Sequence, residues 1–132
     1  MKNLVFDSWA LIAFLQDVSS ESDVEDYINK VHSPDIGAYI SVINLGEIWY
    51  SFARRRSGEF ADRILLEISN LSIEVIDADW DQAYRAAQFK AIGGLAYADC
   101  FGAALAQSLD ASLITGDPEF EKISETVRIA WV

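Results

Sequence analysis

The chain has little cysteine, little histidine and no long apolar run, and each shortage excludes a class of protein. A single cysteine, Cys100, rules out an internal disulfide, and the only histidine, His32, lies at a polar helix end where we expect no catalytic role. No run of about 18 or more residues is apolar throughout, so we expect no membrane span. The first residues, Met1 to Leu4 with Asp7 close behind, are too short and too acidic for a signal peptide. We therefore expect a cytoplasmic protein.

Basic residues are also scarce. The chain has 10 lysines and arginines against 21 aspartates and glutamates, and its net charge is -11. This balance argues against binding of nucleic acid by general electrostatic attraction. If the substrate is RNA, a local basic patch and metal ions must bind it. The same charge favours a basic protein partner.

What the chain does have is enough apolar sequence for one core. Of its 132 residues, 52% are hydrophobic, and neither repeats nor a linker divide them. This length is typical of one domain. We therefore predict a single domain over residues 1–132.

Short apolar runs alternate with helical patterns along the chain. The runs predict strands at 3–6, 38–41, 73–76, 112–115 and 127–130. Apolar residues at helical spacing predict helices at 8–16, 21–32, 42–56, 59–69, 79–92 and 97–109, and a short one at 118–123. Such alternation is typical of parallel strand pairing with helices on both faces. The sequence therefore predicts an α/β fold, a three-layer α/β/α sandwich with a central, mainly parallel sheet of about five strands.

Four acidic residues fall at one edge of this predicted sheet. Asp7 directly follows the first strand, and Asp117 follows the fourth by two residues. Asp99 lies in the first turn of a helix, and Glu47 lies about a turn and a half into the helix after the second strand. Helices that follow parallel strands begin at the carboxyl edge, where α/β sheets bind ligands. We therefore expect all four carboxylates near one rim.

A cluster of this kind is unfavourable without a counter-ion. Carboxylates a few Å apart repel one another, and one of them would stay protonated at a raised pKa. A hard cation such as Mg²⁺ or Mn²⁺ relieves the repulsion, because it prefers oxygen ligands. One or two such ions can orient a phosphodiester and lower the pKa of a bound water. The pattern therefore indicates metal-dependent hydrolysis.

Helix capping is the alternative explanation for three of these acids. Asp7, Asp99 and Asp117 all stand at or near helix starts, where capping and the helix dipole favour aspartate. Glu47 lies inside an apolar helix, where no cap role exists. A surface ion pair is its alternative role.

Three basic residues are candidates for RNA binding. Arg54 and Arg55 belong to the densest basic run, and Arg54 lies two turns beyond Glu47 on the same face. Lys90, like Arg85, precedes the Asp99 segment and could flank the groove. Charge at the carboxyl end of a helix complements the helix dipole, so that role remains open for the arginines. A solvated face is the alternative for Lys90.

Four segments of the sequence together resemble the PIN domain and, within it, the toxin ribonucleases of the VapC kind. The resemblance covers essentially the whole chain. It rests on the segments Leu4-Val5-Phe6-Asp7-Ser8-Trp9-Ala10-Leu11-Ile12-Ala13, Ser41-Val42-Ile43-Asn44-Leu45-Gly46-Glu47, Gly94-Leu95-Ala96-Tyr97-Ala98-Asp99-Cys100-Phe101-Gly102-Ala103-Ala104 and Leu113-Ile114-Thr115-Gly116-Asp117-Pro118-Glu119-Phe120.

This resemblance implies a PIN fold and RNA cleavage dependent on Mg²⁺ or Mn²⁺. It implies that Asp7 and Asp99 are the main metal ligands and that Glu47 and Asp117 complete the site, directly or through water. It further implies supporting roles for the hydroxyl groups at the positions Ser8 and Thr115. Family members are commonly homodimers bound by a cognate antitoxin whose tail covers the active site. The resemblance therefore implies the toxin of a toxin–antitoxin pair.

Two residues depart from the family pattern and keep other functions open. Trp9 stands where the family often has a small hydroxyl residue, and Ala96 stands where it often has a serine that can cap the next helix. These departures allow a non-catalytic PIN-fold module that binds RNA or protein. A phosphoryl-transfer enzyme with Asp7 as nucleophile is a third reading, but such enzymes usually carry an acid at the position that Trp9 occupies.

Overall fold

A five-stranded parallel sheet forms the centre of the molecule. The computed structural model describes residues 2–16 and 21–132. The strands lie in the order β3-β2-β1-β4-β5, and every neighbouring pair is parallel. Their bounds are β1 Lys2–Phe6, β2 Ile36–Ser41, β3 Glu74–Ile76, β4 Ser112–Thr115 and β5 Ile129–Trp131. The predicted parallel sheet of five strands is confirmed.

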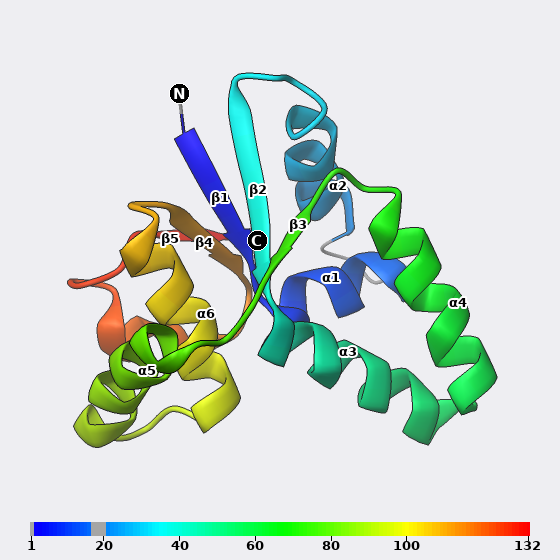
Figure 1. Cartoon of the computed structure of the whole chain (residues 1–132). Coiled ribbons are helices and arrows are strands. Elements are labelled where there is room, and N and C mark those ends of the chain that lie inside the picture. Colours follow the sequence, from blue (N-terminus) through cyan, green and yellow to red (C-terminus); the bar gives the residue numbers. More distant parts are fainter. Residues whose placement is uncertain (1, 17–20) are drawn as a thin grey trace.

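Helices cover both faces of this sheet (Figure 1). One face packs against α1 Ser8–Leu15, α2 Glu21–Lys30, α3 Val42–Arg55 and α4 Gly58–Ser69. The other face packs against α5 Trp80–Ile92, α6 Tyr97–Ser108 and the 3-10 helix η1 Pro118–Ile123. The three-layer α/β/α arrangement predicted from the sequence is therefore confirmed.

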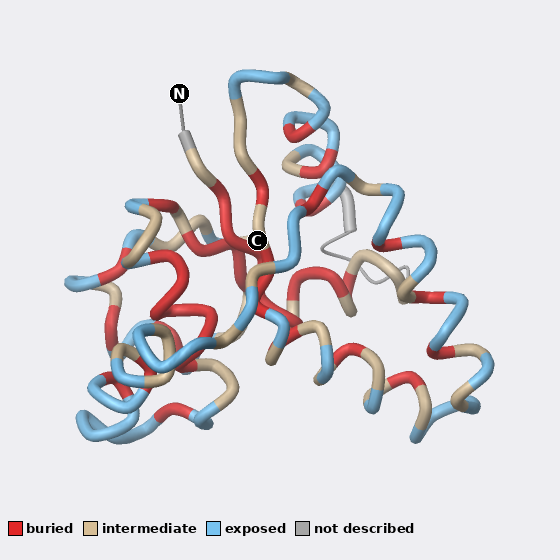
Figure 2. Tube along the Cα trace, in the orientation of Figure 1, coloured by how far each residue is buried: buried red, intermediate tan, exposed pale blue. Residues whose placement is uncertain are grey.

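Side chains of the inner strands point alternately to the two faces of the sheet, and this divides the hydrophobic core into two clusters. In β1, Phe6 packs with the cluster of α1 to α4, while Val5 packs with the cluster of α5 and α6. Ile114 and Leu113 of β4 divide in the same way, since neighbouring side chains of a strand point to opposite faces. Figure 2 shows the buried residues concentrated in the strands and on the inner faces of the helices. Because both faces are covered, the centres of these strands, 4–6 in β1 and 113–114 in β4, are apolar at every position.

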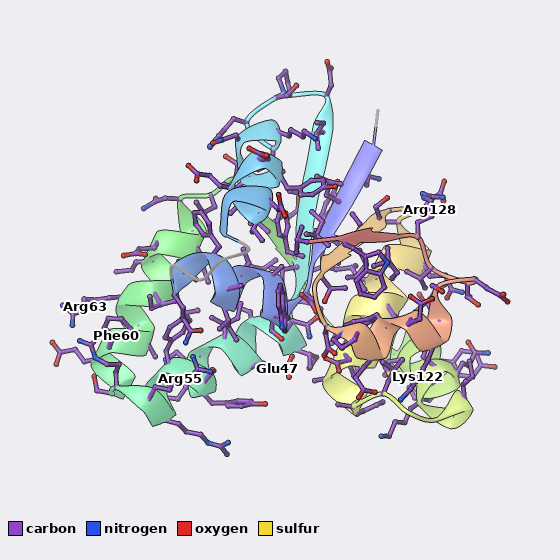
Figure 3. All side chains as sticks on the ribbon, turned by 180° about the vertical axis from the view of Figure 1, so that it is seen from behind. Glu47, Arg55, Phe60, Arg63, Lys122 and Arg128 are labelled. Carbon is purple, nitrogen blue, oxygen red and sulfur yellow. The ribbon has the colours of Figure 1, made fainter. Side chains whose placement is uncertain are left out.

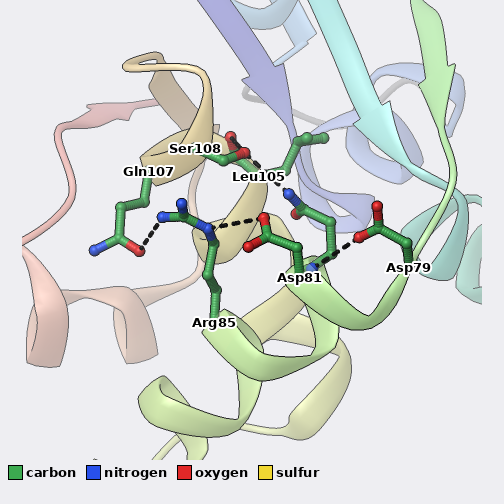
Figure 4. Close-up of polar contacts among 7 residues, drawn as sticks. Asp79, Asp81, Arg85, Leu105, Gln107 and Ser108 are labelled. Carbon is green, nitrogen blue, oxygen red and sulfur yellow. Dashed lines mark hydrogen bonds and ion pairs between the residues drawn. The ribbon is translucent and has the colours of Figure 1, made fainter.

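A polar network joins the surfaces of α5 and α6 (Figure 4). Asp79 caps α5, accepting a hydrogen bond of 2.9 Å from the backbone N–H of Gln82. The Gln82 amide donates to the Ser108 hydroxyl at 3.0 Å. Arg85 pairs with Asp81 at 3.2 Å and donates to the Gln107 side chain. These contacts fix α5 along α6, the helix that carries Asp99.

The last strand is displaced from its predicted position. We expected it at 127–130, whereas β5 spans Ile129–Trp131. The backbone N–H of Val127 donates to the carbonyl of Ile123, so the helical turn of η1 continues past the expected start. Val127 is buried for packing and takes no part in the sheet. The shift brings Trp131 into register with Thr115.

The other predicted elements form with bounds that differ by a few residues. The second strand begins two residues earlier than expected, at Ile36, and α2 ends at Lys30, before His32. In the described ranges, 2–16 and 21–132, no helix has the length and apolar character needed to cross a bilayer.

Candidate active site

Asp7 lies at the carboxyl end of β1 and is almost wholly buried, with 1% of its surface exposed. Its Oδ1 accepts a hydrogen bond of 2.9 Å from the backbone N–H of Ala10 and thereby caps α1. Its Oδ2 accepts one of 2.6 Å from the Thr115 hydroxyl. The predicted cap role is thus confirmed, but each carboxylate oxygen keeps a second lone pair. Capping alone does not explain why a strand end buries a carboxylate so deeply, because burial of a charge is costly.

Glu47 projects from α3 and is held by two donors from different helices. The Ser8 hydroxyl donates to its Oε1 at 2.9 Å, and the Asn44 amide donates to the same atom at 2.9 Å. Ser8 is the residue after Asp7, so this contact joins the Glu47 carboxylate to the start of α1. Among the described residues, no cation pairs with Glu47, in contrast to the surface ion pair considered as its alternative role.

Asn44 connects Glu47 to the helix that carries Asp99. Its amide donates a second hydrogen bond, of 3.0 Å, to the carbonyl of Ala98. Asn44 is fully buried, and its Oδ1 has no hydrogen-bond partner among the described residues. A Cβ on Gly102 would lie 3.3 Å from that Oδ1, so the glycine permits the close approach of α6. Sequence reasoning did not place Asn44 in the site, although an asparagine three residues before Glu47 in an apolar helix was the available signal.

Asp99 lies in the first turn of α6 and caps nothing. The cap position is Ala96, which makes no side-chain cap hydrogen bond. The missing serine at that position therefore leaves α6 without a side-chain cap, as expected. Asp99 is half-buried. Helix capping thus fails to explain this acid.

Asp117 follows β4 and caps η1. Its Oδ1 accepts a hydrogen bond of 3.0 Å from the backbone N–H of Glu119, so the predicted cap role is confirmed. Its own N–H donates to the Thr115 hydroxyl at 3.1 Å. Thr115 thus contacts both Asp7 and Asp117 and orients one relative to the other.

The acids act on one another electrostatically. The pKa of Asp7 is raised from 3.8 to about 7, chiefly by burial and in smaller part by the charges of Asp99 and Asp117, while the hydrogen bonds from Thr115 and Ala10 oppose the shift. Burial raises the pKa of Asp99 to about 6, together with the charges of Glu47, Asp117 and Glu119. Asp99 is therefore within electrostatic reach of the other three predicted carboxylates, and Glu119 is a fifth acid in the group.

The donor set suits a hydrated hard cation. In the part of the chain that the structure describes, no three acidic, histidine or cysteine side chains are placed to hold one ion together. Mg²⁺ needs no such cage, because it keeps several waters and binds through one or two carboxylates. Asp7 and Asp99 have raised pKa values that a nearby cation would lower. The residues therefore fit a cation that binds partly through water.

The predicted RNA-binding residues lie farther from the carboxylates. Arg54 and Arg55 are in the last turn of α3, seven and eight residues after Glu47, or about 10–12 Å along the helix axis. Figure 3 shows Glu47 near the middle of the molecule and Arg55 toward the far end of α3. Both arginines are exposed, and Arg54 stacks over the Tyr50 ring at 5.0 Å. Their position at the helix end agrees with the dipole alternative.

Two other basic residues are bound within the scaffold. Lys90 donates to the carbonyl of Leu95 at 2.8 Å and so holds the segment that leads into α6. Arg85 reaches Gln107, in the last turns of α6, whereas Asp99 lies in the first. The structure therefore places Lys90 nearer to the carboxylates than Arg85.

Comparison with known proteins places this geometry in a family. A family model described as "PIN domain" matches residues 4–126. No curated protein matches the chain significantly.

Similar solved structures share the fold over nearly the full length of both chains. They include DNA-bound VapBC from Salmonella typhimurium, with 23% identity, a TM-score of 0.77 and 98% of each chain covered. Mycobacterium tuberculosis VapC20, described as a sarcin–ricin-loop-cleaving toxin, has 13% identity and a TM-score of 0.76, with 98% of this chain and 99% of that chain covered. VapBC2 from Rickettsia felis bound to promoter DNA has 18% identity and a TM-score of 0.71, with 95% and 96% covered. The fold resemblance inferred from the four sequence segments is confirmed.

Proposed function

Because the chain belongs to the PIN domain family, we propose that it is an endoribonuclease that hydrolyses RNA phosphodiester bonds with Mg²⁺ or Mn²⁺. One observation carries the proposal: four acids from separate segments meet at the carboxyl edge of the sheet, where Asp7 and Asp99 have pKa values raised to about 7 and 6. Perturbed titration at such an edge is typical of catalytic sites. The hydrogen bonds that Asp7 accepts from Ala10 and Thr115 do not require a buried charge. They therefore leave the deep burial of this carboxylate unexplained.

In this proposal, each acid has a distinct place. Asp7 and Asp99 would bind the cation directly, and Glu47 and Asp117 would bind it through water and position the attacking water. When bound, the cation supplies Lewis-acid stabilisation and a more acidic water. Ser8 and Asn44 hold Glu47 in place, and Thr115 fixes the Asp7 carboxylate. The hydroxyl groups expected at positions Ser8 and Thr115 would therefore support the site through these hydrogen bonds.

We further propose that the chain is the toxin of a toxin–antitoxin pair. The solved structures with this fold include a toxin–antitoxin complex from Klebsiella pneumoniae and Mycobacterium tuberculosis VapBC-5, described as a member of the VapBC family of toxin–antitoxin systems. A net charge of -11 suits a basic partner segment, which would cover the carboxylates and neutralise them. A homodimer bound by such an antitoxin is the assembly that we propose for the cell.

Cleavage of a single-stranded RNA by the purified protein tests the activity. We expect cleavage with Mn²⁺ or Mg²⁺ and none with EDTA, and we expect Asp99→Asn to abolish it while the circular dichroism spectrum stays unchanged. Asp35→Asn is the matched control, because Asp35 is an exposed acid just before β2, at the opposite edge of the sheet. Full cleavage by the purified Asp99→Asn variant would refute the assignment of the site.

A non-catalytic PIN-fold module that binds RNA or protein is the second candidate. Two observations favour this candidate. Among the described residues, no three acidic, histidine or cysteine side chains are placed to hold one ion together. Both carboxylate oxygens of Asp7 also accept a hydrogen bond already. Metal binding separates the two candidates, because such a module needs no cation. Protein that binds no Mn²⁺ at millimolar concentration would favour the module.

A further inference from the structure

A pocket lies next to Asp117, between residues of β5 and residues in and just before η1. Its volume is about 440 Å³, and Gly116, Pro118, Glu121 and Trp131 line it. Gly116 and Pro118 are the residues on either side of Asp117. Trp131 pairs in register with Thr115, whose hydroxyl binds Asp7. Because neighbouring strands lie about 4.8 Å apart, Trp131 lies one strand away from Thr115 and two strands away from the end of β1, which Asp7 follows.

Gly116 lies close to two tryptophans, Trp131 and Trp9. Trp131 belongs to the pocket and is 44% exposed, which is a large exposed fraction for a tryptophan in a strand. Trp9 packs so closely against Gly116 that a Cβ at position 116 would lie 2.2 Å from its ring. Glycine is therefore required here by the close approach of Trp9.

Charge near the pocket cannot supply the affinity for a polyanion. Glu121 lines it, and Asp117 and Glu119 are the sequence neighbours of its lining residue Pro118. Lys122, labelled on η1 in Figure 3, already pairs with Glu119 at 2.7 Å and with the Gly94 carbonyl at 2.9 Å. A nucleic-acid strand held at this edge must therefore gain binding energy from something other than phosphate contacts. Stacking of bases on aromatic side chains is the usual source of such energy in single-strand binding.

We propose that this pocket binds a nucleobase of the RNA substrate, next to the phosphodiester that is cleaved, and that the base is guanine. The proposal rests on the ribonuclease function proposed above. Trp131 supplies the stacking face, and Pro118 and Gly116 supply an apolar floor. Glu121 belongs to the lining, and no lysine or arginine among the described residues pairs with its carboxylate, whose Oε1 accepts only a long hydrogen bond of 3.5 Å from the Ser124 hydroxyl.

Glu121 determines the choice of base in this proposal. A carboxylate accepts hydrogen bonds only, so it selects a base edge that donates them. Unpaired guanine presents two adjacent donors, N1–H and N2–H, that match the two oxygens of a carboxylate. Uracil presents one N–H between two carbonyl oxygens that a carboxylate would repel. Single-stranded RNA exposes these edges for recognition.

Binding of short oligoribonucleotides tests the subsite separately from cleavage. The probes are fluorescent heptamers of uridine, with or without one central guanosine, measured by anisotropy in EDTA, which removes the cation that the proposed cleavage requires. We expect the guanosine heptamer to bind at least about 10-fold more tightly than the uridine heptamer. Trp131→Ala should weaken its binding by about 10-fold or more, since stacking of one base contributes about 1–3 kcal/mol.

Matched variants separate stacking, base choice and folding. Trp131→Phe should retain most of the affinity because it keeps a ring. Glu121→Gln should lower the preference for guanosine over uridine, because an amide offers one acceptor in place of two. Trp80→Ala is the control, since Trp80 is 74% exposed but follows β3, at the opposite edge of the sheet. Thermal unfolding of each variant establishes that the fold persists.

The outcomes distinguish the subsite from the proposed function. If wild-type protein cleaves RNA but Trp131→Ala leaves heptamer binding and the pattern of cleavage positions unchanged, the subsite is refuted and the ribonuclease stands. If wild-type protein cleaves nothing but binding still depends on Trp131 and guanosine, the subsite stands and the ribonuclease fails. A Trp131→Ala variant that changes only the oligomeric state in sedimentation would assign the surface to a second copy of the chain and overturn the proposal.

Discussion

Replacement of Asp7 by asparagine should stabilise the metal-free protein, and the gain should grow with pH. Asp7→Asn removes the charge but keeps an amide oxygen that can accept from Ala10, and the Thr115 hydroxyl can accept from the new amide. A pKa raised from 3.8 to about 7 means that the folded state disfavours the ionised form. At 1.36 kcal/mol per pKa unit, this preference corresponds to about 4 kcal/mol in the fully ionised protein.

The sign follows from proton binding. Below pH 3.8 the Asp7 carboxyl is protonated in both the folded and the unfolded chain, so the penalty is absent. Between pH 3.8 and about 7 only the unfolded chain ionises, and the wild-type protein loses stability as the pH rises. Above about pH 7 both states are ionised and the penalty is constant. Asparagine does not titrate, so the difference between the two proteins isolates this residue.

Urea unfolding in EDTA, followed by circular dichroism at pH 5 and pH 8, measures the effect. The lower pH stays above the isoelectric point of about 4.3, where solubility is lowest. Since pH 5 lies about two units below the pKa, the advantage of Asp7→Asn should grow by about 3 kcal/mol between the two conditions. Asp35→Asn should show no such growth. An Asp7→Asn variant that is less stable than wild type at pH 8, or a difference independent of pH, would refute the reasoning.

Three further predictions concern the groups that hold the carboxylates. Asn44→Ala should lower the free energy of unfolding by about 1–3 kcal/mol in urea titrations, because the variant loses the hydrogen bonds to Glu47 and Ala98; RNA cleavage should fall as well, and unchanged cleavage would remove Asn44 from the site. Thr115→Val should raise the pKa of Asp7 further, because it removes a hydrogen-bond donor to the carboxylate. Calorimetry should therefore show that this variant binds Mn²⁺ more weakly than wild type at pH 7 and equally well at pH 9, whereas Thr115→Ser should bind like wild type at both pH values. Mn²⁺ should raise the melting temperature more at pH 8 than at pH 5.5, because protons compete for carboxylates with pKa values of about 7 and 6, and an equal shift at both pH values would contradict this.

The position of the four acids could be predicted from the sequence because it depends on topology. Asp7 and Asp117 each follow a strand, and the carboxyl ends of parallel strands lie at one edge whatever the details of packing. Apolar strands and helical spacing predict that topology. The cap roles of Asp7, Asp79 and Asp117 depend on residues two or three positions away, and they too were predictable.

Contacts between distant segments were beyond the sequence patterns. The hydrogen bond from Asn44 to the Ala98 carbonyl joins residues 54 positions apart and depends on how closely α6 approaches α3. The role of Trp131 depends on where β5 begins, and the apolar Val127 suggested too early a start. In the structure Val127 continues the helical turn of η1, because its N–H finds the Ile123 carbonyl before the sheet begins. Periodicity does not reveal such local competition for hydrogen bonds.

Isothermal titration of the wild-type protein with MnCl₂ tests most directly whether the clustered carboxylates form a cation site. At pH 8 we predict binding of one or two ions per chain, with the heat lost in Asp7→Asn and Asp99→Asn and retained in Asp35→Asn. Absence of binding by wild-type protein at millimolar Mn²⁺, or equal binding by all four proteins, would contradict the account.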